Sequence, residues 1–221
     1  MLKRSSEYLL LLCLAGCATT APQQPVVAPA PDAPATAVAA PASASGVSTA
    51  ANKPATVALA LPLQKKMDEA AERLIAGQKD LALALYAEVQ QTAPEHVSAW
   101  LNAALIKREQ KELPAALTLI EQSLQHRPNE PRALTLKGVV LREQGKLQDA
   151  KAAYLAAVAA DETYAPAHRN LAVLADVYLD EPVLALQHME RYAALVGDDK
   201  QVNSWVTELK RRAQGKATGG P

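Results

Sequence analysis

The chain of 221 residues contains no phenylalanine, and aromatic residues make up only 4% of it. Its four histidines have no histidine or cysteine partner three or four positions away, and no HExxH segment occurs. The spacings that build metal sites are therefore missing. Glycine-rich phosphate loops and a G-x-S-x-G nucleophile turn are also missing. From these absences we expect no cofactor, no metal and no catalytic activity.

The chain also lacks an excess of charge of either sign. Lys and Arg number 23, Asp and Glu number 23, and the formal net charge is zero. If residues 1–16 are removed, 21 basic and 22 acidic residues remain, which leaves a net charge near −1. Proteins that bind nucleic acid carry clustered basic residues to neutralise phosphates. A nucleic-acid partner is therefore not expected.

Long apolar runs are absent too, and the one run near the N-terminus, Tyr8–Leu14, is too short to cross a bilayer. Lys3 and Arg4 precede it, and small residues follow it, which is typical of a secretory signal. The segment Leu14-Ala15-Gly16-Cys17 resembles the bacterial lipobox. That resemblance implies cleavage before Cys17, a diacylglycerol on its sulfur and an acylated amino group. The alternative is an ordinary secreted protein with an incidental cysteine.

Cys13 lies inside the apolar run and would leave with residues 1–16, so only the lipidated Cys17 would remain. Neither a disulfide framework nor a thiol catalyst is then available. Several acyl chains, at about 0.8 kcal/mol per buried CH2, would make the membrane attachment effectively permanent. Under the sorting rule of this class of lipoprotein, Ala18 implies the outer membrane, facing the periplasm, in a Gram-negative host.

Residues 17–60 are expected to form a disordered tether. From Ala18 to Ala60 there are 16 Ala and 7 Pro among 43 residues, with only two charged side chains and no aromatic one. Such a composition cannot bury enough apolar surface to offset the entropy of ordering. As a coil the segment would span roughly 35–40 Å, enough to hold a domain clear of a membrane.

The rest of the chain repeats one spacing, a small residue followed four positions later by a large apolar residue. The steps between successive copies are 34, 34 and 35 residues. A fixed period of this length indicates a repeat architecture. The copies are Ala82 and Tyr86, Ala116 and Ile120, Ala150 and Tyr154, and Ala185 and Met189.

Other positions keep the same period. Ala70, Ala104, Gly138 and Ala172 share one position, which is always small, as is expected where two helices approach closely. The pattern resembles the tetratricopeptide repeat family, whose helix–turn–helix unit of about 34 residues carries W-x2-L-G-x2-Y, then A-x3-F, then P. The resemblance implies an all-α solenoid, a right-handed superhelix of about four helical hairpins. The fourth copy has one extra residue, which we expect near 180–182.

The solenoid is expected over residues 61–213, with a disordered tail over 214–221. Glycines at 77 and 145 are expected to end first helices, and Asp80 and Ser98 to cap the helices that follow them. Beyond Gly197, apolar residues recur at Val202, Trp205, Val206 and Leu209, which predicts a terminal helix covering the last repeat. Trp205 is therefore interpreted as a packing residue.

In tetratricopeptide arrays the first helix of each pair lines a concave groove, and the resemblance places a partner-binding groove here. We expect an apolar floor with arginines at its margins, suited to a protein segment with apolar anchors and some acidic groups. The expected groove residues are Leu101, Asn102, Leu105, Arg108, Arg132, Thr135, Val139, Arg142, Arg169, Asn170 and Val173. Leu101 and Leu105 occupy positions where the clamp of chaperone-binding members needs polar groups.

The sequence thus favours a lipid-anchored scaffold or adaptor of the bacterial cell envelope that binds a protein partner and does no covalent chemistry. Anchored proteins of this shape resemble pilotins of secretin rings, and similar lipoproteins accompany TonB-like or gliding-type machines. Two alternatives stay open. One is an accessory protein that recruits peptidoglycan enzymes, and the other is a receptor for a small ligand.

Overall fold

The computed structural model describes the backbone of residues 60–218 and the side chains of residues 60–215. Residues 1–16, Cys17 and the tether up to residue 59 lie outside the described residues, so the expectations for them stay predictions. The described residues are helical throughout apart from short turns. No helix among them is both long and apolar enough to cross a membrane.

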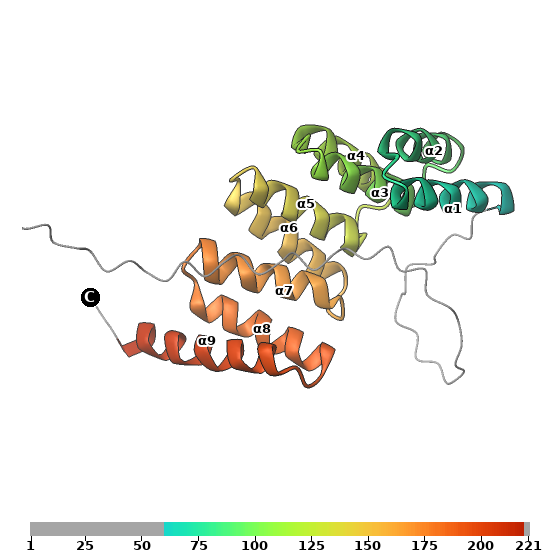
Figure 1. Cartoon of the computed structure of the whole chain (residues 1–221). Helices are drawn as coiled ribbons and strands as arrows, with labels where there is room; N and C mark the ends of the chain where they lie inside the picture. Colours follow the sequence, from blue (N-terminus) through green and yellow to red (C-terminus); the bar gives the residue numbers. More distant parts are fainter. Residues whose placement is uncertain (1–59, 219–221) are drawn as a thin grey trace, which may run out of the picture. The chain divides into compact units, whose positions relative to one another are not determined.

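Each expected repeat is a pair of helices, and the hairpins follow one another from α1 to α9 (Figure 1). The closest packing is within each pair, and each second helix also contacts the first helix of the next pair. The described residues therefore form a solenoid of four hairpins with a terminal helix, as predicted. The elements are α1 (Leu61–Ile75), α2 (Lys79–Thr92), α3 (Val97–Glu109), α4 (Leu113–His126), α5 (Pro131–Glu143), α6 (Leu147–Ala160), α7 (Ala165–Val173), a π-helical turn η1 (Leu174–Tyr178), α8 (Pro182–Val196) and α9 (Lys200–Thr218).

The turn inside every hairpin contains one residue with positive φ. Gly77 and Gly145 have φ of 74° and 76°, as their predicted role after the first helix requires. Lys111, with φ of 63°, and Asp180, with φ of 52°, occupy the matching positions of the second and fourth hairpins. The backbone turn is thus the same in all four hairpins, although only two of them have the residue that adopts it without strain.

Two predicted helix caps are wrong. The second helix of the first hairpin is capped at Gln78 and α3 is capped at His96, so Asp80 and Ser98 already lie within the first turns. Asp80 still lies where a carboxylate is favoured, close to the positive end of the helix dipole. Both helices begin earlier than the cap preference of Asp and Ser suggested. For α2 the positive-φ turn at Gly77 fixes where the chain re-enters a helix.

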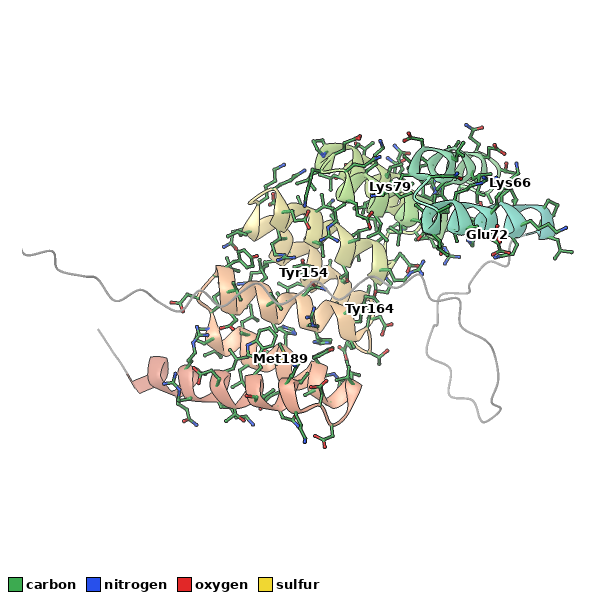
Figure 2. The ribbon with its side chains drawn as sticks, viewed as in Figure 1. Lys66, Glu72, Lys79, Tyr154, Tyr164 and Met189 are labelled. Atoms are coloured by element: carbon green, nitrogen blue, oxygen red, sulfur yellow. The ribbon has the colours of Figure 1, made fainter. Side chains whose placement is uncertain are left out.

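The core lies between the two helices of each hairpin and between successive hairpins. The small residues Ala82, Ala116, Ala150 and Ala185 are fully buried, and the large residues four positions later are at most 1% exposed. Gly138 shows how close the approach is, because a Cβ on it would lie 2.4 Å from Cε1 of Tyr154. Tyr154 lies in the middle of the stack (Figure 2).

The extra residue of the fourth repeat lies earlier than predicted. Instead of lengthening the turn near 180–182, it widens the end of α7 into the π-helical turn η1, in which the N–H of Leu179 donates to the carbonyl of Leu174 over 3.2 Å. The N–H of Glu181 then donates to the carbonyl of Ala175. A π turn absorbs one residue within a helix and rotates the side chains that follow it.

The terminal helix α9 packs on α8, as the apolar stripe predicted, and Leu209 on it is fully buried. Asp199 caps it by accepting the N–H groups of Gln201 and Val202 at 2.8 and 3.2 Å. The helix continues to Thr218, so the expected boundary at 213 lies one turn too early and residues 214–218 belong to the helix. Met189 of α8 lies between α8 and α9 in the cluster that this helix covers (Figure 2).

Candidate protein-binding face

The expected groove residues lie on α3, α5 and α7, the first helices of the last three hairpins. Helix α5 contacts both α3 and α7, so the three helices lie side by side. Side chains one repeat apart also meet directly, since Nη2 of Arg132 donates to Oγ of Ser98 over 3.0 Å. We call the surface formed by the expected groove residues of α3, α5 and α7, together with Tyr178 of η1, the first-helix face.

Three of the expected groove residues are core residues. Leu101 and Thr135 are 6% exposed and Val139 is 8% exposed. Leu101 and Val139 belong to the main core cluster, where they pack successive hairpins together. They are therefore not the accessible apolar floor that the sequence predicted. Leu105 and Val173 are half-buried and remain as apolar side chains that a partner can reach.

The arginines of the face connect neighbouring repeats. Nε and Nη2 of Arg108 on α3 lie 2.6 and 2.5 Å from Oε1 of Glu143 on α5, and both side chains are about four-fifths buried. Arg132 bonds Glu130 over 3.2 Å as well as Ser98. These charge-assisted bonds hold the first helices in place. Two arginines that were expected to bind acidic groups of a partner thus already form ion pairs within the chain.

Arg142 differs from the other two because it faces an aromatic ring. Its Nη1 donates to the hydroxyl of Tyr178 over 3.0 Å, and its guanidinium carbon lies 5.4 Å from the centroid of that ring. Tyr178 is the last residue of the π turn and is 40% exposed. An exposed aromatic side chain stacked with a cation gives a surface that binds apolar and acidic groups together.

The two asparagines of the face also have partners within the chain. Nδ2 of Asn102 donates to the hydroxyl of Tyr86 over 3.3 Å, and Nδ2 of Asn170 donates to the carbonyl of Pro166 over 2.8 Å. Burial raises the pKa of Tyr86, and the bond from Asn102 partly offsets that rise. Each asparagine keeps its side-chain carbonyl as an acceptor for the N–H of a bound chain.

The structure joins several polar residues that the sequence reasoning missed. Asp176 accepts the indole N–H of Trp205 over 3.0 Å and pairs with Arg212, which ties α9 to the π turn. The Ser98–Arg132 and Arg108–Glu143 pairs are separated by 34 and 35 residues. Complementary side chains one period apart in the sequence could have predicted these two pairs. The sequence reasoning considered partners only within one helix.

The described residues contain no group of three or more His, Cys, Asp or Glu side chains that could hold a metal ion. Asp161, which is one of the carboxylates at the helix junctions, accepts the N–H and hydroxyl of Thr163 at 2.8 and 2.7 Å. It therefore orders a turn, as Asp199 does at the start of α9. What the face offers chemically is hydrogen bonding, apolar contact and charge.

A family model described as tetratricopeptide repeat matches residues 67–131, 107–165 and 135–196, which together cover more than half of the 221 residues. The chain belongs to the tetratricopeptide repeat family. Proteins of this fold are platforms on which other protein chains assemble.

Solved structures with the same fold share little sequence with this tetratricopeptide repeat chain. That of pilF from Pseudomonas aeruginosa has a TM-score of 0.60 with 18% identity, covering 69% of each chain. MamA from Desulfovibrio magneticus RS-1 has a TM-score of 0.57 with 18% identity, covering 71% of this chain and 88% of that one. At these identities the likeness concerns the fold alone.

One relative by sequence is the mouse protein named protein O-mannosyl-transferase TMTC1, which is 28% identical over 156 residues. The match covers 68% of this chain and 16% of that protein. This chain therefore corresponds to a small part of the mouse relative.

Proposed function

We propose that this protein is a lipid-anchored scaffold of the bacterial cell envelope, and that its first-helix face binds a segment of a protein partner. The partner would belong to an envelope complex whose assembly the scaffold assists. The observation that carries the proposal is the set of side chains left accessible on the face. Leu105, Val173 and Tyr178 offer apolar contact beside arginines and asparagines.

The anchoring part of the proposal rests on the sequence of residues 1–60. The segment Leu14-Ala15-Gly16-Cys17 follows a short apolar run, and the Ala- and Pro-rich residues after it provide the length of a tether. Ala18 favours the outer membrane and a domain in the periplasm. An acyl group on Cys17, measured by mass spectrometry of the protein extracted from bacterial membranes, tests this part. A mature protein without a lipid contradicts it.

The binding part rests on how the accessible residues are arranged. Leu105 and Val173 lie 68 positions apart, which is two periods of the repeat, so they occupy equivalent places on α3 and α7. Two apolar positions on the helices that lie on either side of α5 fit an extended or helical segment with spaced apolar anchors. Asn102 and Asn170 are also 68 positions apart and so occupy equivalent places, and their side-chain carbonyls can accept backbone N–H groups of the bound segment.

The scaffold is proposed to act without covalent chemistry of its own. Arg108 and Arg132 of the face are used to join helices, and the described residues bring no nucleophile and base together there. Positioning a partner requires only affinity and a fixed geometry. A few accessible anchors are sufficient, because most of the energy of an interface comes from a small number of residues.

Affinity capture from envelope extract with the full chain as bait tests the binding part. In the double variant Leu105→Glu and Val173→Glu, both charges lie on half-buried positions of the face, and we expect the partner to be lost. Val139→Glu is unsuitable because Val139 is a core residue. Circular dichroism should show unchanged helicity in the variant.

The matched control places the same two charges on second helices. Leu155 on α6 and Val183 on α8 are 40% and 63% exposed, so the double variant Leu155→Glu and Val183→Glu should fold and keep the partner. If the control loses the partner and the Leu105/Val173 variant keeps it, the second helices form the binding surface and the proposal is wrong.

A further inference from the structure

Two histidines meet inside the last hairpin. His168 on α7 and His188 on α8 are 4% and 6% exposed, and their Nδ1 atoms lie 3.0 Å apart. The ring centroids are separated by 5.2 Å. His168 occupies the position that holds Trp100 in the second repeat and Leu134 in the third. The last hairpin is thus closed by a polar contact where the third repeat has an apolar side chain.

The contact fixes which ring nitrogen carries a proton. Nε2 of His168 lies 3.2 Å from the carbonyl oxygen of Glu162, which can only accept, so this nitrogen is the donor. In the neutral ring, Nδ1 of His168 is then an acceptor, and Nδ1–H of His188 donates to it. While His188 carries its proton on Nδ1, a proton added to His168 would occupy that acceptor and set two N–H groups against each other.

The surroundings also disfavour a positive charge on either ring. Burial is the main cause that lowers the pKa of His188, to about 4, and the neighbouring His168 lowers it further. Burial also lowers the pKa of His168, with Arg191 of α8 acting in the same direction, while Glu162 acts against them.

Two pairs of oppositely charged groups lie on the helices around the histidines. From α9, Lys210 reaches Glu190 of α8 at 2.9 Å. From α5, Arg132 is held by Glu130 at 3.2 Å. Neither carboxylate is therefore left to compensate a proton on the histidines.

We propose that the His168–His188 pair is an acid-sensitive contact that holds the last hairpin closed while both rings are neutral and releases it on acidification. The direction follows from proton uptake. A histidine in an opened hairpin regains its ordinary pKa of 6.5, so below that pH the opened form binds more protons than the closed form. The closed hairpin keeps its full stability above 6.5 and loses it as the pH falls towards 4.

Opening this hairpin would remove one of the three helices that form the first-helix face. Helix α7 carries Arg169, Asn170 and Val173 of the face, and α8 supports α9. The repeats before it contain no buried histidine, since the other two described histidines lie at inter-repeat turns. Acid should therefore act on one end of the solenoid, and the three earlier hairpins should keep their packing.

Hydrogen exchange measured by mass spectrometry on the full chain tests the proposal. Rates at pH 7 and pH 5 are corrected for the intrinsic pH dependence of exchange, and peptides from α7–α8 are compared with those from α3–α6 in the same sample. We expect the protection of α7–α8 relative to α3–α6 to fall by about tenfold or more, since each additional proton bound on opening gives up to about tenfold per pH unit. An unchanged ratio would overturn the proposal.

The variant His188→Asn sharpens the test. Its amide nitrogen can take the place of Nδ1 and donate to His168, but it cannot be protonated near pH 5. The acid-induced fall should be smaller than in the parent chain. The exposed His126 gives the matched control, and His126→Asn should show the same fall as the parent. A fall in His188→Asn as large as in the parent contradicts the proposal.

A second measurement uses the parent chain, so it does not depend on whether a variant folds. The Cε1 proton resonances of the four histidines can be followed by NMR as the pH is lowered. The two buried rings should keep their neutral shifts down to about pH 5, and should change together with the loss of the native α7–α8 signals. Two buried rings that titrate near 6.5 in the folded chain would overturn the proposal.

Discussion

The third and fourth hairpins are built on the same period but closed by different chemistry. In α5–α6 the contact is apolar and tight, with Gly138 against the ring of Tyr154. In α7–α8 the matching large residue is Met189, and polar contacts are added by the histidine pair and by Asp176 in the π turn. The comparison shows that the repeat fixes the positions of side chains and leaves their chemistry free.

This difference has a physical consequence. Apolar contacts are nearly independent of pH and salt, whereas contacts between titratable groups depend on both. We therefore expect the third hairpin to be the invariant part of the solenoid and the fourth to be the part that conditions can change. The predictions below change contacts of these two kinds and, in the last case, the backbone of a turn.

The largest effect is expected for Asp176→Ala. The Asp176 side chain is only 10% exposed and holds both Trp205 and Arg212 of α9, so its loss leaves the indole N–H without its acceptor and leaves Arg212 with Asp180 alone, 3.7 Å away. We expect α9 to lose about 2–4 kcal/mol of stability. Hydrogen exchange of α9 amides measures this. Glu208→Ala removes an exposed partner of Arg211 on the same helix and should leave the exchange of α9 amides nearly unchanged. Equal effects of the two variants would contradict the role given to Asp176.

The next effect is expected for Gly138→Ala. The added methyl would lie 2.4 Å from the Tyr154 ring, so the ring or the helices must shift. Overpacking of this kind costs about 1–3 kcal/mol, measurable as a lower urea midpoint. Gly215→Ala on α9 meets no atom within 4 Å and should stabilise its helix by about 0.5–1 kcal/mol. The two Gly→Ala substitutions should thus change the stability in opposite directions.

A smaller effect is expected for Arg108→Gln, which tests whether this arginine joins repeats. Glu143, whose side chain is 20% exposed, would lose its cation. We expect a loss of about 1–2 kcal/mol in urea denaturation. The exposed pair of Arg73 and Glu69 provides the control, since Arg73→Gln should cost less than about 0.5 kcal/mol. A cost for Arg108→Gln as small as that for Arg73→Gln would show that the inter-repeat pair adds no stability.

The smallest effect is expected for Lys111→Gly. Lys111 has φ of 63° in a turn where the first and third hairpins have glycine. Glycine removes the strain of a Cβ at positive φ but adds freedom to the unfolded chain, so the net gain should be at most about 1 kcal/mol. Thermal unfolding measures it. Gly145→Ala, at the matching position with φ of 76°, should act in the opposite direction.

The period predicted most of the fold because it constrains many residues at once. Alanines 34 residues apart could only be buried together if the helices between them repeated, and all four are buried. The positive-φ turns at Gly77 and Gly145 were predicted for the same reason, since few other residues adopt that conformation readily. The turn at Lys111 was not, because nothing in lysine indicates positive φ.

The candidate site was less predictable than the fold. Register showed which residues lie on the first helices, but not how much of each is covered by the next repeat, and so Leu101 and Val139 were misjudged as accessible. The π turn, which brings Tyr178 to Arg142 and Asp176 to α9, depends on where one extra residue is absorbed. Inserting the extra residue at any of several positions along α7 and the following turn gives the same number of residues between the helices. Only packing selects among these positions.

The histidine pair was missed for a related reason. The search for partners looked three and four residues along one helix, whereas His168 and His188 come from two helices of a hairpin and are 20 residues apart. Their meeting depends on the rotation of α8 relative to α7, to which the π turn contributes. Hairpin partners can be sought from sequence only after the turn between the helices is known.

The central claim is that a protein partner binds to the first-helix face, and hydroxyl-radical footprinting of the complex tests it most directly. The full chain is oxidised with and without the partner that it captures, and the modified side chains are located by mass spectrometry. The account predicts that the partner protects Leu105, Val173 and Tyr178, while Leu155 and Val183 on the second helices are modified to the same extent as before. Protection of Leu155 and Val183 with no change at Leu105, Val173 and Tyr178 would contradict it.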